Sequence, residues 1–384
     1  MLYKYLVTTL ILIVFSRCNN TPINIESPDT KIFTADFKST ANAIDTLLLS
    51  TIYDKFDYIQ LETHDDLLIG DIRDIQIVRN KIYVQAFAES KIGIFNLNGK
   101  IINKLDHRGQ GPREYLACNS FDVDPRNGNI SVLDNANHKI FVYDSLCNYI
   151  GNTSYDKNDY PRDVAILDNG DYLLYGPDIN FGGRRGLWQI SDNGEFKKQL
   201  ISIDENFKLD GIHTKYFYRM NDSTISLMGM EDCNRIYHIT KDSITAPYKI
   251  DIRPQMSEKI IRISQPTDDE KKNGNFYIKH SYLENDDWVR TSIQNSEDEV
   301  ITLYYDKNTQ ELITCKNNTI LENDIKIISS IPLFQTNKYH ISYFNYYNIY
   351  QDEECMNMFP ELTEDANPII VLLHTKNNTQ NENN

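Results

Sequence analysis

The strongest constraint in this sequence is a repeat of short runs in which apolar and polar residues alternate, separated by turn residues. In the first copy the runs lie at residues 74–78, 81–84, 91–95 and 101–102. Alternation with a period of two predicts half-buried β-strands, and four such runs in succession predict a four-stranded meander. The pattern returns at 120–150 and 162–194, and in weaker form at 216–250, 276–315 and 325–373.

The spacing of these copies, roughly 40 to 60 residues, is at or above the blade length of propellers and far above that of ankyrin or leucine-rich repeats. The sequence therefore predicts an all-β fold, a single six-bladed β-propeller. Asn-Gly pairs predict tight turns between its strands, with positive φ at both central residues. These pairs begin at Asn98, Asn127, Asn169 and Asn193.

A strand-like run precedes the first meander and has no blade of its own. It covers residues 55–61 and is rich in aromatic and aliphatic side chains. A ring of blades that simply began and stopped would leave a strand edge without a partner, which is a site for aggregation. We therefore expect this N-terminal strand to pair with the sheet that contains residues 368–373, so that the first and last strands close the ring.

Charge limits the partners of the chain. Lys and Arg number 39 against 55 Asp and Glu, a formal net charge of -16. A phosphate backbone would be repelled over most of such a surface, so nucleic acid is not expected as a partner. The 25 Tyr and 16 Phe residues favour strands, which agrees with the all-β prediction.

The N-terminus has the pattern of an export signal. Lys4 is followed by an apolar stretch from Leu6 to Phe15, too short to cross a hydrocarbon core that needs about twenty residues. The predicted organisation is a lipoprotein-type signal peptide at 1–18, a flexible tether at 19–50, the propeller at 51–375 and a disordered tail at 376–384.

The end of the signal resembles the lipobox of bacterial lipoproteins. The residues are Phe15-Ser16-Arg17-Cys18, and in that family the cysteine thiol takes a diacylglycerol. The resemblance implies that Cys18 is lipidated and holds the protein at a membrane. Arg17 departs from the pattern, because the residue before the cysteine is usually small. Simple secretion and an uncleaved anchor are the alternatives.

A second resemblance covers residues 50 to 375. It is carried by the segments at 58–62 and 95–100, by Asn367-Pro368, and above all by Gly109-Gln110-Gly111-Pro112-Arg113-Glu114-Tyr115. These segments are similar to the six-bladed β-propeller lipoproteins of Bacteroidota, which are similar to NHL-repeat propellers. Arg113 stands where that family usually has glycine. Membership implies the propeller fold and a place in the cell envelope, on the periplasmic or surface side, and says little about chemistry.

The residues around this block are the first candidates for a binding site. In the functional interpretation, Arg108, Arg113 and Glu114 present polar groups at one mouth of the central channel. In the structural interpretation, Glu114 and Tyr115 hydrogen-bond to backbone and lock one blade to the next. Arg184 and Arg185, flanked by glycines, could grip a carboxylate or sulfate or could form a mobile hairpin tip.

No motif marks an enzyme. The eight histidines have no HExxH spacing, and no Gly-x-Ser-x-Gly nucleophile elbow occurs. Paired acids such as Asp122 with Asp124 fit solvated turns as well as a cation site. No catalytic residue, metal site or cofactor is therefore predicted. A metal-dependent lyase or lactonase is the alternative, and His107, Asp134, His213 and Glu231 are the residues to test for it.

Cysteine usage indicates no zinc site. Apart from Cys18 the chain has five widely spaced cysteines and no CxxC. Buried single cysteines are expected, with one or two disulfides as the alternative. The predicted role is a binding or scaffolding module for a peptide, glycan or protein, with the membrane as a partner through the lipid. A purely structural envelope protein is a third possibility.

Overall fold

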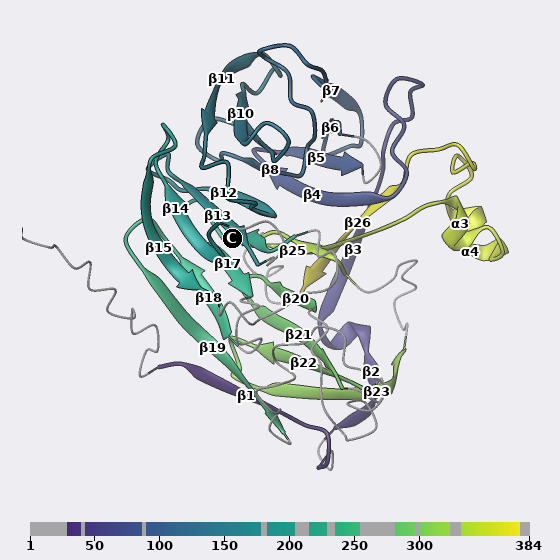
Figure 1. Cartoon of the computed structure of the whole chain (residues 1–384). Coiled ribbons are helices and arrows are strands. Elements are labelled where there is room, and N and C mark those ends of the chain that lie inside the picture. The colour runs from purple at the N-terminus through teal and green to yellow at the C-terminus, as the bar shows by residue number, and fades with distance from the viewer. Residues whose placement is uncertain are drawn as a thin grey trace, which may run out of the picture.

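The computed structural model describes most of the chain beyond its first 28 residues. The described residues are 29–39, 43–86, 90–177, 183–203, 215–228, 235–253, 281–295, 299–322 and 332–376. Six sheets stand side by side around a central axis (Figure 1). Their first strands contact one another around that axis. The predicted six-bladed, all-β propeller is confirmed.

The first three blades are antiparallel meanders whose strands follow one another in sequence. Blade 1 is β4 (Ile72–Val78), β5 (Lys81–Ala86), β6 (Ile92–Asn96) and β7 (Ile101–Leu105). Blade 2 is β8 (Ser120–Val123), β9 (Ile130–Asp134), β10 (Lys139–Tyr143) and β11 (Tyr149–Ser154). Blade 3 is β12 (Asp163–Ile166), β13 (Tyr172–Gly176), β14 (Gly186–Ile190) and β15 (Phe196–Ser202).

Blades 4 and 5 each carry a fifth strand from the N-terminal segment. Blade 4 is β16 (Phe217–Arg219), β17 (Ile225–Met228), β18 (Arg235–Ile239) and β19 (Ile244–Arg253), to whose outer edge β1 (Lys31–Asp36) adds in parallel. Blade 5 is β20 (Ser281–Glu284), β21 (Trp288–Gln294), β22 (Val300–Asp306) and β23 (Leu312–Glu322), with β2 (Ile44–Leu48) added in the same way.

These added strands correct the prediction of a flexible tether over residues 19–50. Residues 31–36 and 44–48 are paired strands, and η1 (Leu49–Thr51) follows them. In β1, Phe33 is buried while Ile32 on the opposite face is exposed. The segment is ordered because an outer blade edge offers it a ladder of backbone hydrogen bonds and one apolar face. Residues 19–28 lie outside the described residues, as do the signal peptide at 1–18 and the tail beyond Lys376.

Blade 6 closes the ring as expected. It combines β24 (Phe334–Gln335), β25 (Tyr339–Phe344) and β26 (Ile369–Thr375) with β3 (Tyr53–Gln60) from the N-terminal part of the chain. β26 and β3 are antiparallel, with Ile369 opposite Gln60 and Val371 opposite Tyr58. The predicted pairing of the early strand with the sheet at 368–373 is confirmed.

The four predicted Asn-Gly turns are present, but their geometry differs from the expectation. Only the glycines have positive φ, from 77° at Gly99 to 91° at Gly170, and the preceding asparagines do not. In the turn after β6, the Gly99 N–H donates to Asn96 O, and the Asn96 N–H donates to Lys100 O. This is a type I turn followed by a glycine bulge, which needs one left-handed residue rather than two.

The core is divided among the spaces between blades. Six clusters of buried apolar residues occur in the described chain, and each joins two neighbouring blades around the ring. One of them fills the junction of blades 6 and 1, where Ile370 of β26 packs with Ile75 and Phe95. The closing strands are therefore held by packing as well as by hydrogen bonds, since burial of apolar surface is the main stabilising term in folding.

Two short helices, α3 (Tyr346–Ile349) and α4 (Glu353–Met358), form an insertion between β25 and β26 and project from the ring (Figure 1). No described helix has the length and apolar character needed to span a bilayer. Cys118, Cys147 and Cys315 are buried and Cys355 is partly buried, and none of the four forms a disulfide within the described part of the chain. Cys18 and Cys233 lie outside the described residues.

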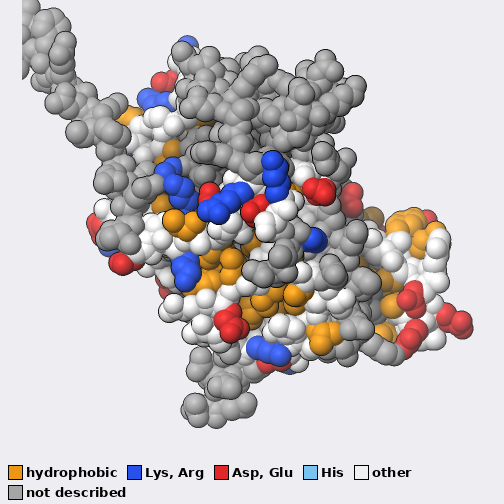
Figure 2. Space-filling model, turned by 90° about the horizontal axis from the view of Figure 1, so that it is seen from below, with side chains coloured by type: hydrophobic (Ala, Val, Ile, Leu, Met, Phe, Trp, Pro, Cys, Tyr) orange, Lys and Arg blue, Asp and Glu red, His pale blue; other side chains and the backbone are white. Residues whose placement is uncertain are grey.

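Seen from below, the molecule shows hydrophobic side chains gathered on one face, with Lys and Arg side chains along its border (Figure 2). This is the side on which β1 and β23 lie in Figure 1.

Candidate functional site

A cavity of about 340 Å³ lies on the propeller axis. Its wall comes from the innermost strands of five blades, because β4, β8, β12, β16 and β24 all contribute side chains. Its rim is made by turns that join first to second strands, represented by Arg79, Pro125, Asp222 and Asn337. The volume is at the small end of the range for ligand pockets, roughly 300–1,000 Å³.

A buried lysine lies at the centre of the cavity wall. The Nζ of Lys215 is 2.9 Å from a carboxylate oxygen of Asp74 and 3.9 Å from one of Asp163. Burial acts to lower the pKa of Lys215, but the carboxylates of Asp163, Asp74 and Asp122 outweigh it and raise the pKa above its ordinary value. Lys215 is therefore a charged donor and not a nucleophilic amine.

Asp163 joins three blades through its carboxylate. It accepts hydrogen bonds from the backbone N–H groups of Tyr216 and Phe217, both at 2.8 Å, and from the hydroxyl of Ser120. These donors come from blades 4 and 2, while Asp163 itself begins β12 of blade 3. The carboxylate is fully buried, so these bonds fix the relative positions of the inner strands.

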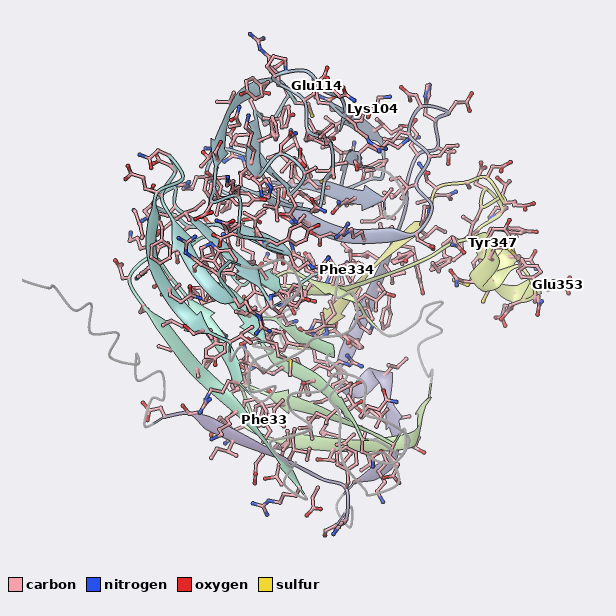
Figure 3. The ribbon with its side chains drawn as sticks, in the orientation of Figure 1. Phe33, Lys104, Glu114, Phe334, Tyr347 and Glu353 are labelled. Carbon is pink, nitrogen blue, oxygen red and sulfur yellow. The ribbon has the colours of Figure 1, made fainter. Side chains whose placement is uncertain are left out.

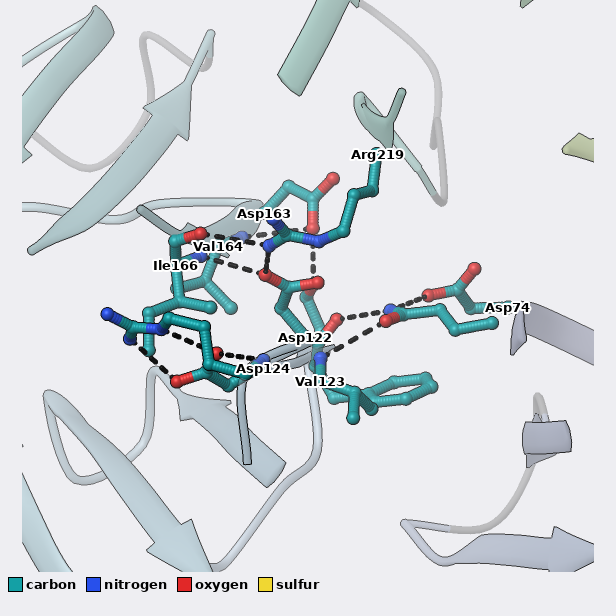
Figure 4. A network of polar contacts seen from close by, with 12 residues as sticks. Asp74, Asp122, Val123, Asp124, Asp163, Val164, Ile166 and Arg219 are labelled. Carbon is teal, nitrogen blue, oxygen red and sulfur yellow. Dashed lines mark hydrogen bonds and ion pairs between the residues drawn. The ribbon is translucent and has the colours of Figure 1, made fainter. Parts of the chain in front are cut away.

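Arg219 and Asp122 form a second ion pair of the wall (Figure 4). Nη2 of Arg219 is 2.5 Å from Oδ2 of Asp122 and donates to the carbonyl of Ile166 at 2.9 Å. Asp122 also accepts the backbone N–H of Ile166. Nearby, burial acts to raise the pKa of Asp124, but the hydrogen bonds and the charge of Arg126 outweigh it and hold that pKa below its ordinary value.

Two polar groups of the wall retain free hydrogen-bonding capacity. The buried Nε of Arg219 has no hydrogen-bond partner among the described residues. The hydroxyl of Tyr218 makes no hydrogen bond to the described part of the chain; burial raises its pKa, and the Asp74 carboxylate acts in the same direction while Lys215 opposes it. Tyr218 and Arg219 both line the cavity, but the buried Nε of Arg219 has no surface through which a bound molecule could reach it.

The carboxyl of Asp74 is the other titratable group of interest. Burial raises its pKa above the ordinary value, although Lys215 and the side-chain amide of Gln76 act against this effect. Gln76 in turn bridges blades 1 and 2, donating to Phe121 O at 2.8 Å and accepting the N–H of Val123 at 3.2 Å.

Apolar side chains complete the wall. Phe217 and Phe334 are buried, and Ile77 and Ile225 line the cavity beside them. The lining therefore combines an apolar part with a few convergent polar groups, which is the usual composition of a small-molecule site.

The predicted block at 109–115 lies elsewhere. It connects β7 to β8, and so belongs to the face of the ring opposite the rim turns. None of Arg108, Arg113, Glu114 and Tyr115 is in the cavity lining. Figure 3 shows Glu114 at the periphery of the first two blades and Phe334 near the centre of the ring.

The contacts of that block are those of a structural connection. The Glu114 carboxylate accepts the N–H of Gly111 at 2.8 Å. The hydroxyl of the buried Tyr115 donates to Ser90 O at 2.6 Å in blade 1. The hydroxyl of Tyr143 in blade 2 donates to Arg113 O at 3.0 Å. These bonds join blades 1 and 2, as the structural interpretation predicts.

The two arginines of blade 3 also have partners within the fold. Arg184 pairs with Asp159 and lies over the ring of Phe196 at 4.2 Å. Arg185 donates to the carbonyl of Pro177 at 2.9 Å. Neither lines the axial cavity.

The residues suggested for a metal-dependent enzyme do not converge where they can be placed. His107 contacts the carbonyl of Cys147, and Asp134 accepts the N–H of Leu116 and the amide of Asn137. Within the described residues, no group of three or more His, Cys, Asp or Glu could hold a metal. His213 and Glu231 lie outside the described residues.

Sequence reasoning singled out Asp122 but missed its partner. Asp122 and Arg219 are 97 residues apart, and no spacing in the chain relates them. Lys215 and Tyr218 were missed for the same reason. The sequence does contain one signal for the site: a polar residue within the first strand of a meander whose other residues are apolar. Asp74 and Gln76 are such residues in the first meander.

A second hollow, of about 750 Å³, is more open and lies between β3, the turn after β6 and the segment after α4. Tyr58, Glu62, Lys100 and Glu361 are among its lining residues. It is bounded mainly by one strand and two surface turns.

Comparison with known proteins identifies the fold and the family. No curated protein matches the chain. A solved structure of a presumed exported protein from Bacteroides fragilis has a TM-score of 0.72 and 16% identity, over 90% of this chain and 100% of that one. A member of the DUF4221 family from Bacteroides vulgatus has a TM-score of 0.50 and 15% identity, over 84% and 97% of the two chains. The model of the family described as "Domain of unknown function (DUF4934)" matches residues 32–374, and the chain therefore belongs to the DUF4934 family.

Proposed function

We propose that this propeller is an exported, lipid-anchored binding module of the cell envelope, and that its ligand site is the axial cavity. The observation that carries the proposal is the cavity itself, on which the innermost strands of five blades converge with both polar and apolar side chains. A concave site that combines an apolar part with a few convergent polar groups is the usual composition of a ligand pocket, and this supports an external ligand.

Export and anchoring are supported by the signal at 1–18 and by the similarity to a presumed exported protein. The lipid would attach at Cys18, and the ring would then lie close to the membrane, because only 12 residues separate Cys18 from β1. Twelve extended residues span about 40 Å at most.

Anchoring is tested by changing the acceptor thiol. The full chain and its Cys18→Ser variant are expressed in a Bacteroides host, and both are fractionated and labelled with radioactive palmitate. We expect the label and the membrane association in the parent chain and neither in the variant. An unlabelled parent chain, or a Cys18→Ser variant that keeps its label, would contradict the anchor.

The site is tested by blocking the rim. The side chain of Asp222 is exposed at the mouth of the cavity and makes no hydrogen bond or ion pair to the described residues, so Asp222→Trp obstructs the entrance with little effect on the fold. Asp242→Trp, on the exposed turn between β18 and β19, is the matched control.

The full chain in detergent is titrated by calorimetry with four probes: maltose, glucuronate, glucosamine and the zwitterionic dipeptide glycylglycine. We expect at least one probe to bind the parent and the Asp242→Trp variant, and to lose binding in Asp222→Trp. Binding that survives in Asp222→Trp, or the failure of all four probes, would count against the axial site.

A further inference from the structure

We propose that the hollow beside β3 and the tyrosines of the insertion together form a docking surface for a basic, extended segment of a protein partner. This surface is separate from the axial cavity, so the proposal goes beyond the ligand site proposed above. Its basis is the position of the hollow, the charge around it and the exposed aromatic side chains next to it.

The hollow and the insertion adjoin each other. The segment after α4 supplies Glu361, Thr363 and Asp365 to the lining of the hollow. Between the last two of these lies Glu364, whose carboxylate accepts a hydrogen bond from the hydroxyl of Tyr347 in α3. A chain segment that occupies the hollow can therefore also contact the side chain of Tyr347.

Three tyrosines at α3 form a cluster of aromatic rings on the insertion. The rings of Tyr346 and Tyr350 are stacked with their centroids 5.8 Å apart, and the ring of Tyr347 meets them edge-on at 5.7 and 6.4 Å. Tyr347 is 58% exposed and Tyr350 is 48% exposed. Figure 3 shows Tyr347 on the projecting insertion, away from the ring of blades. Tyrosine is enriched in the contact surfaces of protein complexes, which favours a protein as the partner.

The base of the insertion is fixed to blade 6. Ile349 and Leu362 are buried in the apolar cluster that contains Phe344 of β25. The ring of Phe359 packs edge-on against those of Tyr58 and Phe344, with centroids 5.2 and 5.3 Å apart. The surface is therefore formed before a partner arrives, and binding to a preformed surface costs less conformational entropy.

The surface is acidic. The sequence has no Lys or Arg at residues 339–375, and this interval holds six carboxylates: Asp352, Glu353, Glu354, Glu361, Glu364 and Asp365. Among the described residues that line the hollow, Glu62, Glu361 and Asp365 stand against one cation, Lys100, and Lys100 already lies 3.5 Å from a carboxylate oxygen of Glu62. In Figure 2 the same projection, at the right, carries acidic and hydrophobic side chains.

A basic segment matches both parts of this surface. A Lys or Arg side chain that enters the hollow meets the exposed carboxylates of Glu361 and Asp365. A cation is also attracted by the face of a tyrosine ring, and apolar residues next to it can cover the cluster at α3. An acidic segment would be repelled by the same carboxylates. Arginine and tyrosine are both enriched among the residues that dominate binding energy, which fits an arginine-bearing partner.

The test titrates the full chain in detergent by calorimetry with three probes. They are a seven-residue peptide of alternating arginine and valine with blocked ends, the same peptide with glutamine in place of arginine, and arginine amide. Buffer with detergent alone is the blank. We expect the arginine peptide to bind the parent chain about tenfold more tightly than either of the other probes.

Two variants change the surface, and each has a matched control. Glu361→Lys reverses a charge in the hollow, and Tyr347→Ala removes the most exposed ring of the cluster. The controls are Asp242→Lys, on the exposed turn between β18 and β19, and Leu146→Ala, on the turn between β10 and β11. We expect Glu361→Lys and Tyr347→Ala each to weaken binding of the arginine peptide about tenfold, and the controls to leave it unchanged. Thermal melting followed by circular dichroism checks that each variant is folded.

Several results would overturn the proposal. Equal binding of the arginine and glutamine peptides would show that charge is not recognised. A loss of affinity in the controls as large as in Glu361→Lys and Tyr347→Ala would show that the peptide binds the acidic protein without a defined surface. Arginine amide that binds as tightly as the peptide would indicate a site for a small cation. Asp222→Trp should bind the peptide like the parent chain, and a loss there would place the peptide in the axial cavity instead.

Discussion

Asn367 joins the last blade to the first through a single side chain. Its Oδ1 accepts the N–H of Ile69 at 2.6 Å, and its Nδ2 donates to the carbonyls of Glu62 and Leu67 at 2.8 and 2.9 Å. Asn367, Leu67 and Ile69 are all buried, so water is a poor substitute for these bonds. The sequence singled out Asn367-Pro368 only through its resemblance to a known family. The contacts of Asn367 could not be predicted, because nothing in the sequence shows that residues about 300 positions apart meet.

We expect Asn367→Ala to lower the free energy of unfolding by about 3 kcal/mol, since it leaves buried polar groups without partners. Asn98→Ala, in an exposed turn, should change it by less than about 0.5 kcal/mol. Urea unfolding followed by circular dichroism measures both. Equal stability of the two variants would show that this contact does not hold the ring closed.

His340 is a buried titratable residue outside the cavity. Its Nδ1 lies 2.9 Å from the hydroxyl of Tyr53. Burial lowers the pKa of His340 to about 3, and the nearby cations Arg290 and Lys307 act in the same direction. The side chain is therefore neutral when the protein is folded at neutral pH.

Protonation of the unfolded chain makes His340 a source of acid sensitivity. In the unfolded state its pKa is about 6.5, so the unfolded state binds more protons between pH 6.5 and pH 3. The contribution of His340 to the free energy of unfolding is therefore complete above pH 6.5. Below pH 6.5 this contribution decreases by about 1.4 kcal/mol per pH unit. We expect His340→Gln to have a shallower loss of stability between pH 6.5 and 4 than the parent chain.

Urea midpoints measured across this pH range test the prediction. His64→Gln, at an exposed histidine, is the control, and the other titrating groups cancel in the difference between parent and variant. A slope in His340→Gln equal to that of the parent would contradict the buried neutral imidazole.

The N-terminal segment follows the outside of the ring and adds strands to three consecutive blades in order. β1 covers the edge of blade 4, β2 covers that of blade 5, and β3 is the outer strand of blade 6. β3 could be predicted because it is long and rich in aromatic residues. β1 and β2 could not, because a strand on an outer edge is half exposed and its short pattern resembles polar linker sequence.

Phe33 is the anchor of β1. Its ring centroid lies 5.4 Å from that of Tyr248 and 4.9 Å from that of Tyr305, and the residue is 1% exposed, against 59% for Ile32. We expect Phe33→Ala to cost about 3–5 kcal/mol of stability and Ile32→Ala less than about 0.5 kcal/mol. Chemical denaturation compares them. If both changes are harmless, β1 does not dock on blade 4 in solution.

At the scale of the molecule, the repeat was enough to predict the number of blades and the closing strands. The short apolar runs bounded by turns mark the strands of each blade, although each sheet buries both faces against its neighbours and strands such as β9, β13 and β26 are therefore buried along their whole length instead of on alternate residues. The axial site was not predictable, because it depends on side chains from five blades meeting at the axis. Tyr218 and Arg219 enter it from one short innermost strand, β16, and Lys215 lies two residues before that strand.

Closure is expected to be essential for cooperative unfolding. A chain that ends at Ala366 lacks β26, which leaves β3 and β25 without their shared partner. We expect it to show no sharp thermal transition, whereas a chain that ends at Lys376 should melt like the parent. Circular dichroism on heating measures both. A sharp transition in the shorter chain would mean that five blades and an open edge are stable alone.

The pairing of β3 with β26 also sets the order of events during synthesis. His374 contacts Asp57 across 317 residues, and at about 5–20 residues per second the ribosome needs roughly 15–60 s to make that interval. Of the three N-terminal strands, β3 therefore waits longest for its neighbour, because β1 and β2 pair with strands that are made before β26. Until β26 has been made, β3 remains without its partner, and its unpaired edge is open to aggregation. A chaperone that binds the nascent chain therefore has a defined segment to protect.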